Sequence, residues 1–92
     1  MRDKKFYIDS IKMDLYRVVT AVGDIRKPAA TESARCFLRH AEDDFKKMPL
    51  TERENRLFDK LSRLEGSIND KMKDPYNRLR WAEDVLTLRC ML

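Results

Sequence analysis

The amino-acid sequence predicts an all-α protein: a small antiparallel up-down bundle of four helices that forms a single domain over residues 1–92. Three observations support this prediction. Apolar residues recur at spacings of three and four along almost the whole chain, which is the period of an amphipathic helix. The 92 residues include 2 glycines and 3 prolines, too few for the turns of a β-sandwich. This length also allows one domain and excludes a barrel or a doubly wound sheet.

The first helix is expected at residues 4–25. Its apolar stripe advances in steps of three and four and consists of Ile8, Ile11, Leu15, Val18, Val22 and Ile25. A near-heptad stripe of this kind is the seam of an antiparallel or coiled-coil pair. Gly23 and Asp24 weaken the last turn, and Pro28 ends the helix because it pushes Lys27 out of the α region.

The second helix is expected at residues 31–47, where Pro49 follows and ends it. Its inner face consists of Ala34, Phe37, Leu38, Ala41, Phe45 and Met48. The third helix, residues 52–72, begins with the clearest local signal in the chain, because Thr51 and Glu54 form the T-x-x-E pattern of a capping box. Its stripe consists of Leu57, Leu61, Leu64, Ile68 and Met72.

Gly66 lies opposite the apolar stripe of the third helix. The period of three and four continues across it, so we expect one continuous helix; a break at Gly66 is the alternative. Asp74 and Pro75 then open the fourth helix, residues 75–91, as an N-cap followed by proline at the first helical position. The connections are only a few residues long, so consecutive helices should be antiparallel neighbours.

The fourth helix has two apolar faces. One consists of Trp81, Val85, Leu88 and Leu92, and the nearly opposite one of Leu79, Ala82, Leu86 and Cys90. The first helix repeats this more weakly, since Phe6 and Met13 lie away from its main stripe. Apolar faces on both sides indicate burial on both sides. We therefore expect a homodimer with an interface made of Trp81, Val85, Leu88, Leu92, Phe6 and Met13. The alternative is a fourth helix that lies centrally within one chain.

Charge and cysteines favour a cytoplasmic protein without a membrane partner. The net charge is +4, but the signs are finely mixed, so the basic balance favours solubility more than a polyanionic partner. Cys36 and Cys90 have no C-x-x-C spacing and are expected to be reduced thiols. The chain starts without a secretory signal, and it has no apolar run of membrane-spanning length.

Two side-chain patterns could carry chemistry. His40 is the only histidine, and Cys36, His40 and Asp44 follow at four-residue spacing on the expected outer face of the second helix. All three are metal-ligand types, which makes metal binding a distant hypothesis, as is phosphoryl acceptance by His40. A solvated histidine is the simpler interpretation. Acidic neighbours such as Glu42 would repel a phosphoryl group.

The second pattern is a basic row on the third helix. It consists of Arg53, Arg56, Lys60 and Arg63 in steps of three and four. Arginines at this spacing could follow a phosphate backbone, but Glu52, Asp59 and Asp70 run beside them. The row is therefore also compatible with solvated charges that flank a helical partner.

We find no combination of nucleophile, base and orienting group, so the sequence predicts neither catalysis nor a cofactor. The leading hypothesis is a non-catalytic interaction or regulatory module that binds a protein partner through apolar helix faces. A nucleic-acid-associated regulator that uses the basic row is the alternative. A metal-binding or phosphoryl-accepting protein that uses His40 is the most distant one.

Overall fold

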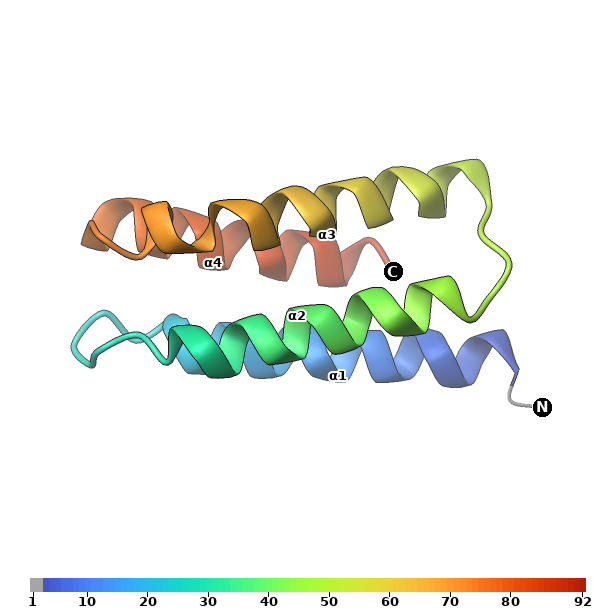
Figure 1. Ribbon diagram of the computed structural model, residues 1–92, viewed down its shortest axis with the longest axis horizontal. Helices are drawn as coiled ribbons and strands as arrows, with labels where there is room; N and C mark the ends of the chain where they lie inside the picture. The colour runs from blue at the N-terminus through green and yellow to red at the C-terminus, as the bar shows by residue number, and fades with distance from the viewer. Residues whose placement is uncertain (1–2) are drawn as a thin grey trace.

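Four helices run alternately up and down in the computed structural model, which describes residues 3–92 (Figure 1). They are α1 (Lys4–Val22), α2 (Thr31–Lys46), α3 (Glu52–Lys71) and α4 (Pro75–Cys90). Figure 1 shows α1 and α2 as one layer and α3 and α4 as the other. Each helix packs against its two neighbours in a square, α1 and α3 both lying against α2 and α4. The predicted four-helix up-down bundle is confirmed, with overall dimensions of 41 × 21 × 19 Å.

Three of the four helices begin at a side-chain cap. The carboxylate of Asp3 accepts a hydrogen bond from the amide of Phe6. Thr51 and Glu54 form both halves of the predicted capping box, and Asp74 caps α4 with Pro75 in its first turn. These caps satisfy amides that have no partner within the helix. The starts of α3 and α4 are therefore determined by local hydrogen bonds, at the residues that the sequence predicts.

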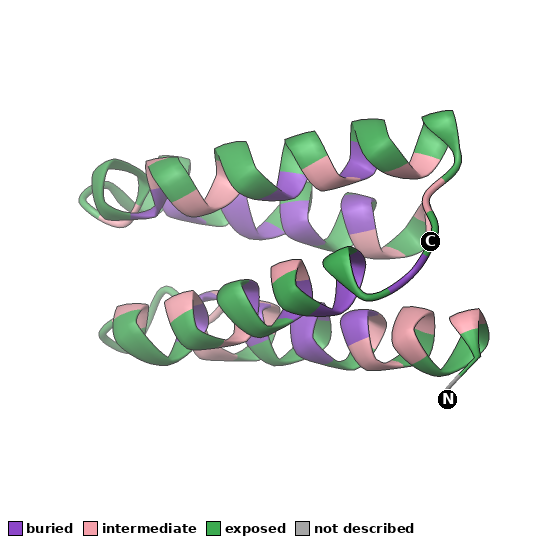
Figure 2. Ribbon diagram, turned by 45° about the vertical axis from the view of Figure 1, so that its right-hand side comes forward, coloured by how far each residue is buried: buried purple, intermediate pink, exposed green. Residues whose placement is uncertain are grey.

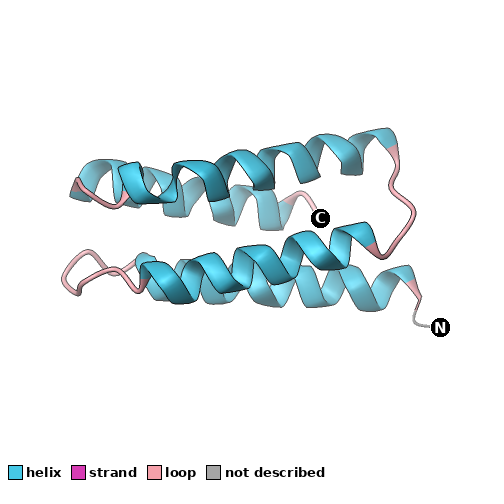
Figure 3. Cartoon of the chain, in the orientation of Figure 1, coloured by secondary structure: helices cyan, strands magenta, loops and turns pink. Residues whose placement is uncertain are grey.

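The first helix ends at Val22, earlier than the predicted end at residue 25. Gly23 closes the last turn with a hydrogen bond from its amide to the carbonyl of Val19, and the Asp24 carboxylate accepts from the amide of Arg26. The connection that follows, residues 23–30, is longer than the few residues expected and is visible as the large loop in Figure 3.

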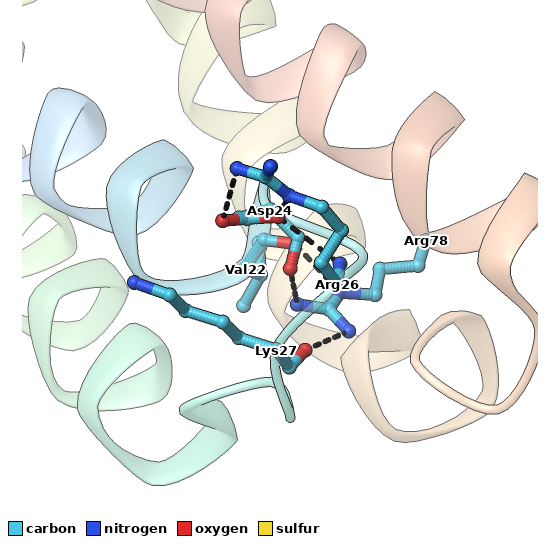
Figure 4. A network of polar contacts seen from close by, with 5 residues as sticks. All are labelled: Val22, Asp24, Arg26, Lys27 and Arg78. Atoms are coloured by element: carbon cyan, nitrogen blue, oxygen red, sulfur yellow. Dashed lines mark hydrogen bonds and ion pairs between the residues drawn. The ribbon is translucent and has the colours of Figure 1, made fainter.

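A buried arginine holds this loop against the fourth helix. Arg78 is 7% exposed and donates hydrogen bonds to the carbonyl oxygens of Val22 at 2.6 Å, Lys27 at 2.7 Å and Asp24 at 2.7 Å (Figure 4). These carbonyls lie at or beyond the C-terminal end of α1, where the helix dipole favours a cation. The guanidinium thus replaces the hydrogen bonds that a longer helix would have made.

The third helix is continuous through Gly66, as predicted. This glycine is exposed, and no heavy atom lies within 4 Å of where its Cβ would be. Neither packing nor backbone conformation requires a glycine there, which is why the helix passes through it.

The core lies between the helices, on the sides that face one another (Figure 2). It consists of Ile11, Leu15, Val18, Val22, Ala34, Leu38, Ala41, Phe45, Met48, Leu57, Leu61, Ile68, Trp81, Ala82, Val85 and Leu88. Within residues 3–92, no helix combines the length and apolar character that crossing a bilayer requires.

The predicted dimer face of the fourth helix is wrong in its choice of residues. Trp81, Val85 and Leu88 are 2%, 0% and 1% exposed and belong to the core of the single chain. The reason is that α4 packs on both α1 and α3, and the wide face needed for two neighbours includes all three residues. The outward side of α4 instead presents Leu79 and Leu86, which are 41% and 43% exposed.

Candidate functional site

A continuous groove follows the seam between α3 and α4. It consists of three adjoining hollows of about 400, 280 and 210 Å³. The first two share Lys60 and Arg63, and the second and third share Leu64, Ser67 and Asp84. We refer to these joined hollows as the α3/α4 groove. It runs from Arg53 at the start of α3 to Lys71 at its end.

The predicted basic row lines this groove. The cations that line the groove are the four of the row, Arg53, Arg56, Lys60 and Arg63, together with Lys71 from α3 and Arg80 from α4. Steps of three and four keep the row beside the apolar stripe of α3, on the flank that faces α4. Two carboxylates, Asp59 and Asp84, also line the groove. Cations therefore outnumber carboxylates along its walls.

The partners of these cations differ. Arg53 donates a 2.5 Å hydrogen bond to the backbone carbonyl of Met91, and Arg56 lies 3.5 Å from Glu52, with both side chains largely exposed. Lys60 and Arg63 form no ion pair within the described part of the chain. The centre of the groove thus carries two cations that are available to a ligand.

Apolar side chains from both helices contribute to the groove between its charged walls. Leu57 and Leu64 come from α3, and Trp81 and Met91 from α4 and its end. The indole Nε1 of Trp81 donates to the carbonyl of Leu64 at 2.9 Å, which fixes the ring at the base of the seam. The groove combines an apolar floor with a cationic wall, a pattern that suits an amphipathic, negatively charged ligand.

A second cluster of polar side chains lies at the opposite edge of the square, between α1 and α2. It consists of Asp14 from α1 and of His40 and Asp44 from α2. The Nδ1 atom of His40 is 2.5 Å from Asp14 Oδ2 and 3.6 Å from Asp44 Oδ2. Both carboxylates are buried, at 3% exposure each, whereas the imidazole side chain is 57% exposed.

The charges around His40 favour its protonated form. The hydrogen bond to Asp14 raises the pKa of His40 above 6.5, partial burial opposes this shift, and the charges of Asp14 and Asp44 add to it. Ser10 donates a 2.7 Å hydrogen bond to Asp44 Oδ2. A hollow of about 360 Å³ opens beside the cluster and is lined by Phe6, Asp9, Ser10, Met13, Asp14, Arg17 and His40.

The structure corrects the predicted metal-ligand set. Cys36 is exposed and lies outside the cluster, and Asp44 is buried instead of lying on an outer face. A four-residue step turns the helix surface by about 40°, so two such steps rotate Asp44 from the outside toward α1 while Cys36 stays outside. Asp14 takes the third place. Asp14 could have been found from the sequence: it follows Ile11 by three positions and precedes Leu15, so the helical period puts its carboxylate on the buried side of the first helix.

The other residues of the predicted interface lie in different surroundings. Phe6 and Met13 are exposed, at 43% and 51%, and the Phe6 ring packs edge-on against Tyr7. Leu92 is half-buried against the core. Apart from Ile25 in the loop after α1, the large exposed apolar residues of the described chain therefore lie on α1 and α4.

Within residues 3–92, no hydroxyl or thiol that could act as a nucleophile is hydrogen-bonded to His40; the nearby Ser10 donates to Asp44 instead.

Comparisons with models of protein families, with curated proteins and with solved structures gave no significant match.

Proposed function

We propose that this protein is a non-catalytic interaction module whose α3/α4 groove binds an acidic, amphipathic segment of a partner protein. One observation carries the proposal: a continuous groove joins an apolar floor to a wall of cations. A helix or extended segment with apolar residues on one side and carboxylates on the other fits this surface.

The two parts of the groove have different roles in this proposal. Lys60 and Arg63, which have no ion-pair partner in the described chain, attract the carboxylates and set orientation and association rate. Leu64 and Met91, which line the groove and are only partly buried, supply the apolar contact that gives most of the affinity. Because the cations are exposed, their contribution weakens with salt, but the apolar contribution does not.

A protein partner is favoured over nucleic acid by the composition of the walls. Asp59 and Asp84 interrupt the cations and would repel a regularly spaced phosphate backbone. Beside Arg80 lies the exposed ring of Tyr76, whose hydroxyl accepts a hydrogen bond from this arginine. No row of aromatic residues suited to base stacking lines the groove in the described chain.

We further propose that this module works in the cytoplasm. Cys36 and Cys90 are both free and exposed, and a reducing compartment is where exposed thiols persist. The homodimer expected from the sequence remains a prediction, now restricted to the outward face of α4 that carries Leu79 and Leu86.

The test uses a fluorescein-labelled helical peptide made of leucine and glutamate, with leucines on one side. Its fluorescence anisotropy is followed as the protein is added. We expect saturable binding, and a loss of affinity of about tenfold or more when Lys60→Glu and Arg63→Glu are combined. The matched control combines Lys5→Glu with Lys46→Glu, two exposed lysines outside the groove, so that both variants change the net charge equally.

Three outcomes would contradict the proposal. One is an absence of binding to the wild-type protein, and another is equal loss in the groove variant and in the control. The third is a DNA or RNA duplex that binds more tightly than the peptide and loses affinity steeply between low and moderate salt, which would favour the nucleic-acid alternative.

A further inference from the structure

The cluster of Asp14, His40 and Asp44 has the geometry of a small metal site. Each residue offers one ligand atom, and these atoms all lie within 4.8 Å of one another. First-row metal ions hold nitrogen and oxygen ligands at about 2.0–2.2 Å, so ligand atoms on opposite sides of an ion are about 4.4 Å apart. Small side-chain rotations are enough to bring the three atoms around one ion. Two helices supply the ligands, so the site is fixed by the packing of α1 on α2.

The two carboxylates of this seam are buried, and the cations beside them are largely exposed. Asp14 and Asp44 are both 97% buried by side-chain packing, with 3% exposure each. Besides His40, the nearest cations are Arg17, 3.7 Å from Asp14, and Lys47, 3.9 Å from Asp44. Both of these side chains are more than half exposed. Buried carboxylates need close compensation. Within the described chain, the one cation hydrogen-bonded to either carboxylate is His40, through Asp14, whereas Arg17 and Lys47 lie at longer ion-pair distances on the solvent side.

The surroundings also meet the needs of a bound ion. The hydroxyl of Ser10 donates to Asp44 Oδ2 at 2.7 Å and fixes the orientation of this carboxylate, as outer-shell hydrogen bonds do in metal proteins. The hollow of about 360 Å³ beside Asp14 and His40 gives an ion a path from solvent and leaves room for water ligands. The protein thus holds the Asp44 carboxylate in a fixed orientation, and the hollow leaves the site accessible to solvent.

From this arrangement we propose that Asp14, His40 and Asp44 bind one divalent first-row transition-metal ion, with water completing its coordination. One imidazole nitrogen and two carboxylate oxygens form a donor set that suits Zn²⁺, Co²⁺, Ni²⁺ or Mn²⁺. The ion replaces the proton between His40 Nδ1 and Asp14, and this proton leaves to solvent. The site lies at the α1/α2 edge, opposite the α3/α4 groove, and does not depend on the proposed function of that groove.

The experiment is a calorimetric titration of the EDTA-treated, dialysed protein with ZnCl₂, followed by absorption spectroscopy with CoCl₂. We expect one ion per chain, and visible cobalt bands without thiolate charge transfer, because no cysteine is a ligand. His40→Gln should lower the affinity for Zn²⁺ at least about tenfold, and Asp44→Asn should do the same.

Matched controls separate this site from others. Asp43→Asn removes an exposed carboxylate next to Asp44, and Cys36→Ser removes the nearest thiol on α2; both should keep wild-type affinity. His40→Gln changes an exposed side chain, so it tests the site even where a buried aspartate variant fails to fold. The proposal is overturned by an absence of stoichiometric binding, by unchanged affinity in His40→Gln, or by loss of binding in Cys36→Ser.

Discussion

The indole nitrogen of Trp81 donates a 2.9 Å hydrogen bond to the backbone carbonyl of Leu64, which ties α4 to α3 from within the core. The tryptophan is 2% exposed. Trp81→Phe keeps an aromatic ring but removes the donor and part of the volume, so we expect the free energy of unfolding to fall by about 1–3 kcal/mol. Urea denaturation followed by circular dichroism measures this change. A loss near zero would show that the hydrogen bond contributes nothing.

Charged substitutions distinguish the buried face of α4 from its outward face. Because Trp81 and Leu88 belong to the core, combining Trp81→Glu with Leu88→Glu should abolish helicity. The pair Leu79→Lys and Leu86→Lys, on the outward face, should leave the circular dichroism spectrum unchanged. Light scattering on a sizing column then tests the homodimer: if Leu79 and Leu86 form its interface, this second pair yields a folded monomer. A folded Trp81/Leu88 variant would contradict the burial described above.

Of the arginines on α4, Arg78 is expected to lower the free energy of unfolding most when it is replaced. Replacement by methionine keeps much of the side-chain volume but leaves the carbonyls of Val22, Asp24 and Lys27 without their buried donor. We expect a loss of about 2–4 kcal/mol in the free energy of unfolding. The control is Arg80→Met on the same helix, an exposed arginine whose side chain donates a hydrogen bond to the hydroxyl of Tyr76. For this variant a change within about 0.5 kcal/mol is expected.

Gly66 offers the opposite kind of test, an increase in stability. Since a Cβ at this exposed helical position meets no heavy atom within 4 Å, Gly66→Ala should raise the free energy of unfolding by about 0.5–1 kcal/mol. At Gly23 a Cβ would lie 2.6 Å from the carbonyl oxygen of Val19, so Gly23→Ala should be destabilising. Thermal melts of both variants compare the signs directly, and a destabilised Gly66→Ala would show that the helix needs the glycine.

Glu42 gives the protein a pH-dependent stability. Burial, then the hydrogen bond to Glu65 and its negative charge, raise the pKa of Glu42 to about 7 from its ordinary value of 4.5. The folded chain therefore holds a proton that the unfolded chain releases, and the free energy of unfolding should fall as the pH rises from about 4.5 to about 7. The hydrogen bond from Glu42 lowers the pKa of Glu65. Glu65 therefore changes the free energy of unfolding only at more acidic pH than Glu42 does.

Glu42→Gln tests this assignment because the amide donates toward Glu65 at every pH. We expect the variant to lose part of the decline between pH 5 and pH 7 in urea denaturation, whereas the exposed Glu83→Gln keeps it. His40, whose pKa is also raised, contributes a decline of the same sign to all three proteins. Identical pH profiles for wild type and Glu42→Gln would refute a shared proton between Glu42 and Glu65.

Local signals in the sequence predicted the helices well because their physical causes are local. The capping box at Thr51, the Asp74–Pro75 start and the period across Gly66 each act within a few residues. The predicted end of α1 at residue 25 was too late: Gly23 and Asp24 close the helix locally, and Arg78, from the far end of the chain, takes the carbonyl of Val22. No sequence pattern near Val22 predicts that its carbonyl accepts a hydrogen bond from Arg78.

The candidate sites divide in the same way. The basic row lay on the predicted flank of the third helix because helical periodicity determines it. The His40 cluster could not be assembled from one helix, since Asp14 comes from another element. On the fourth helix the core takes Trp81, Val85 and Leu88 together with Ala82 from the other apolar face, because α4 packs on both α1 and α3.

The hydrogen bonds of Arg78 also bear on the order in which the chain folds. They join the end of the first helix to the last helix across 56 positions of sequence. Until α4 docks, the carbonyl of Val22 has only water as a donor, and the last turn of the first helix is left to fray. We therefore expect the α1 C-terminus and α4 to acquire protection from hydrogen exchange together, as one cooperative unit, and not in the order in which they occur in the chain.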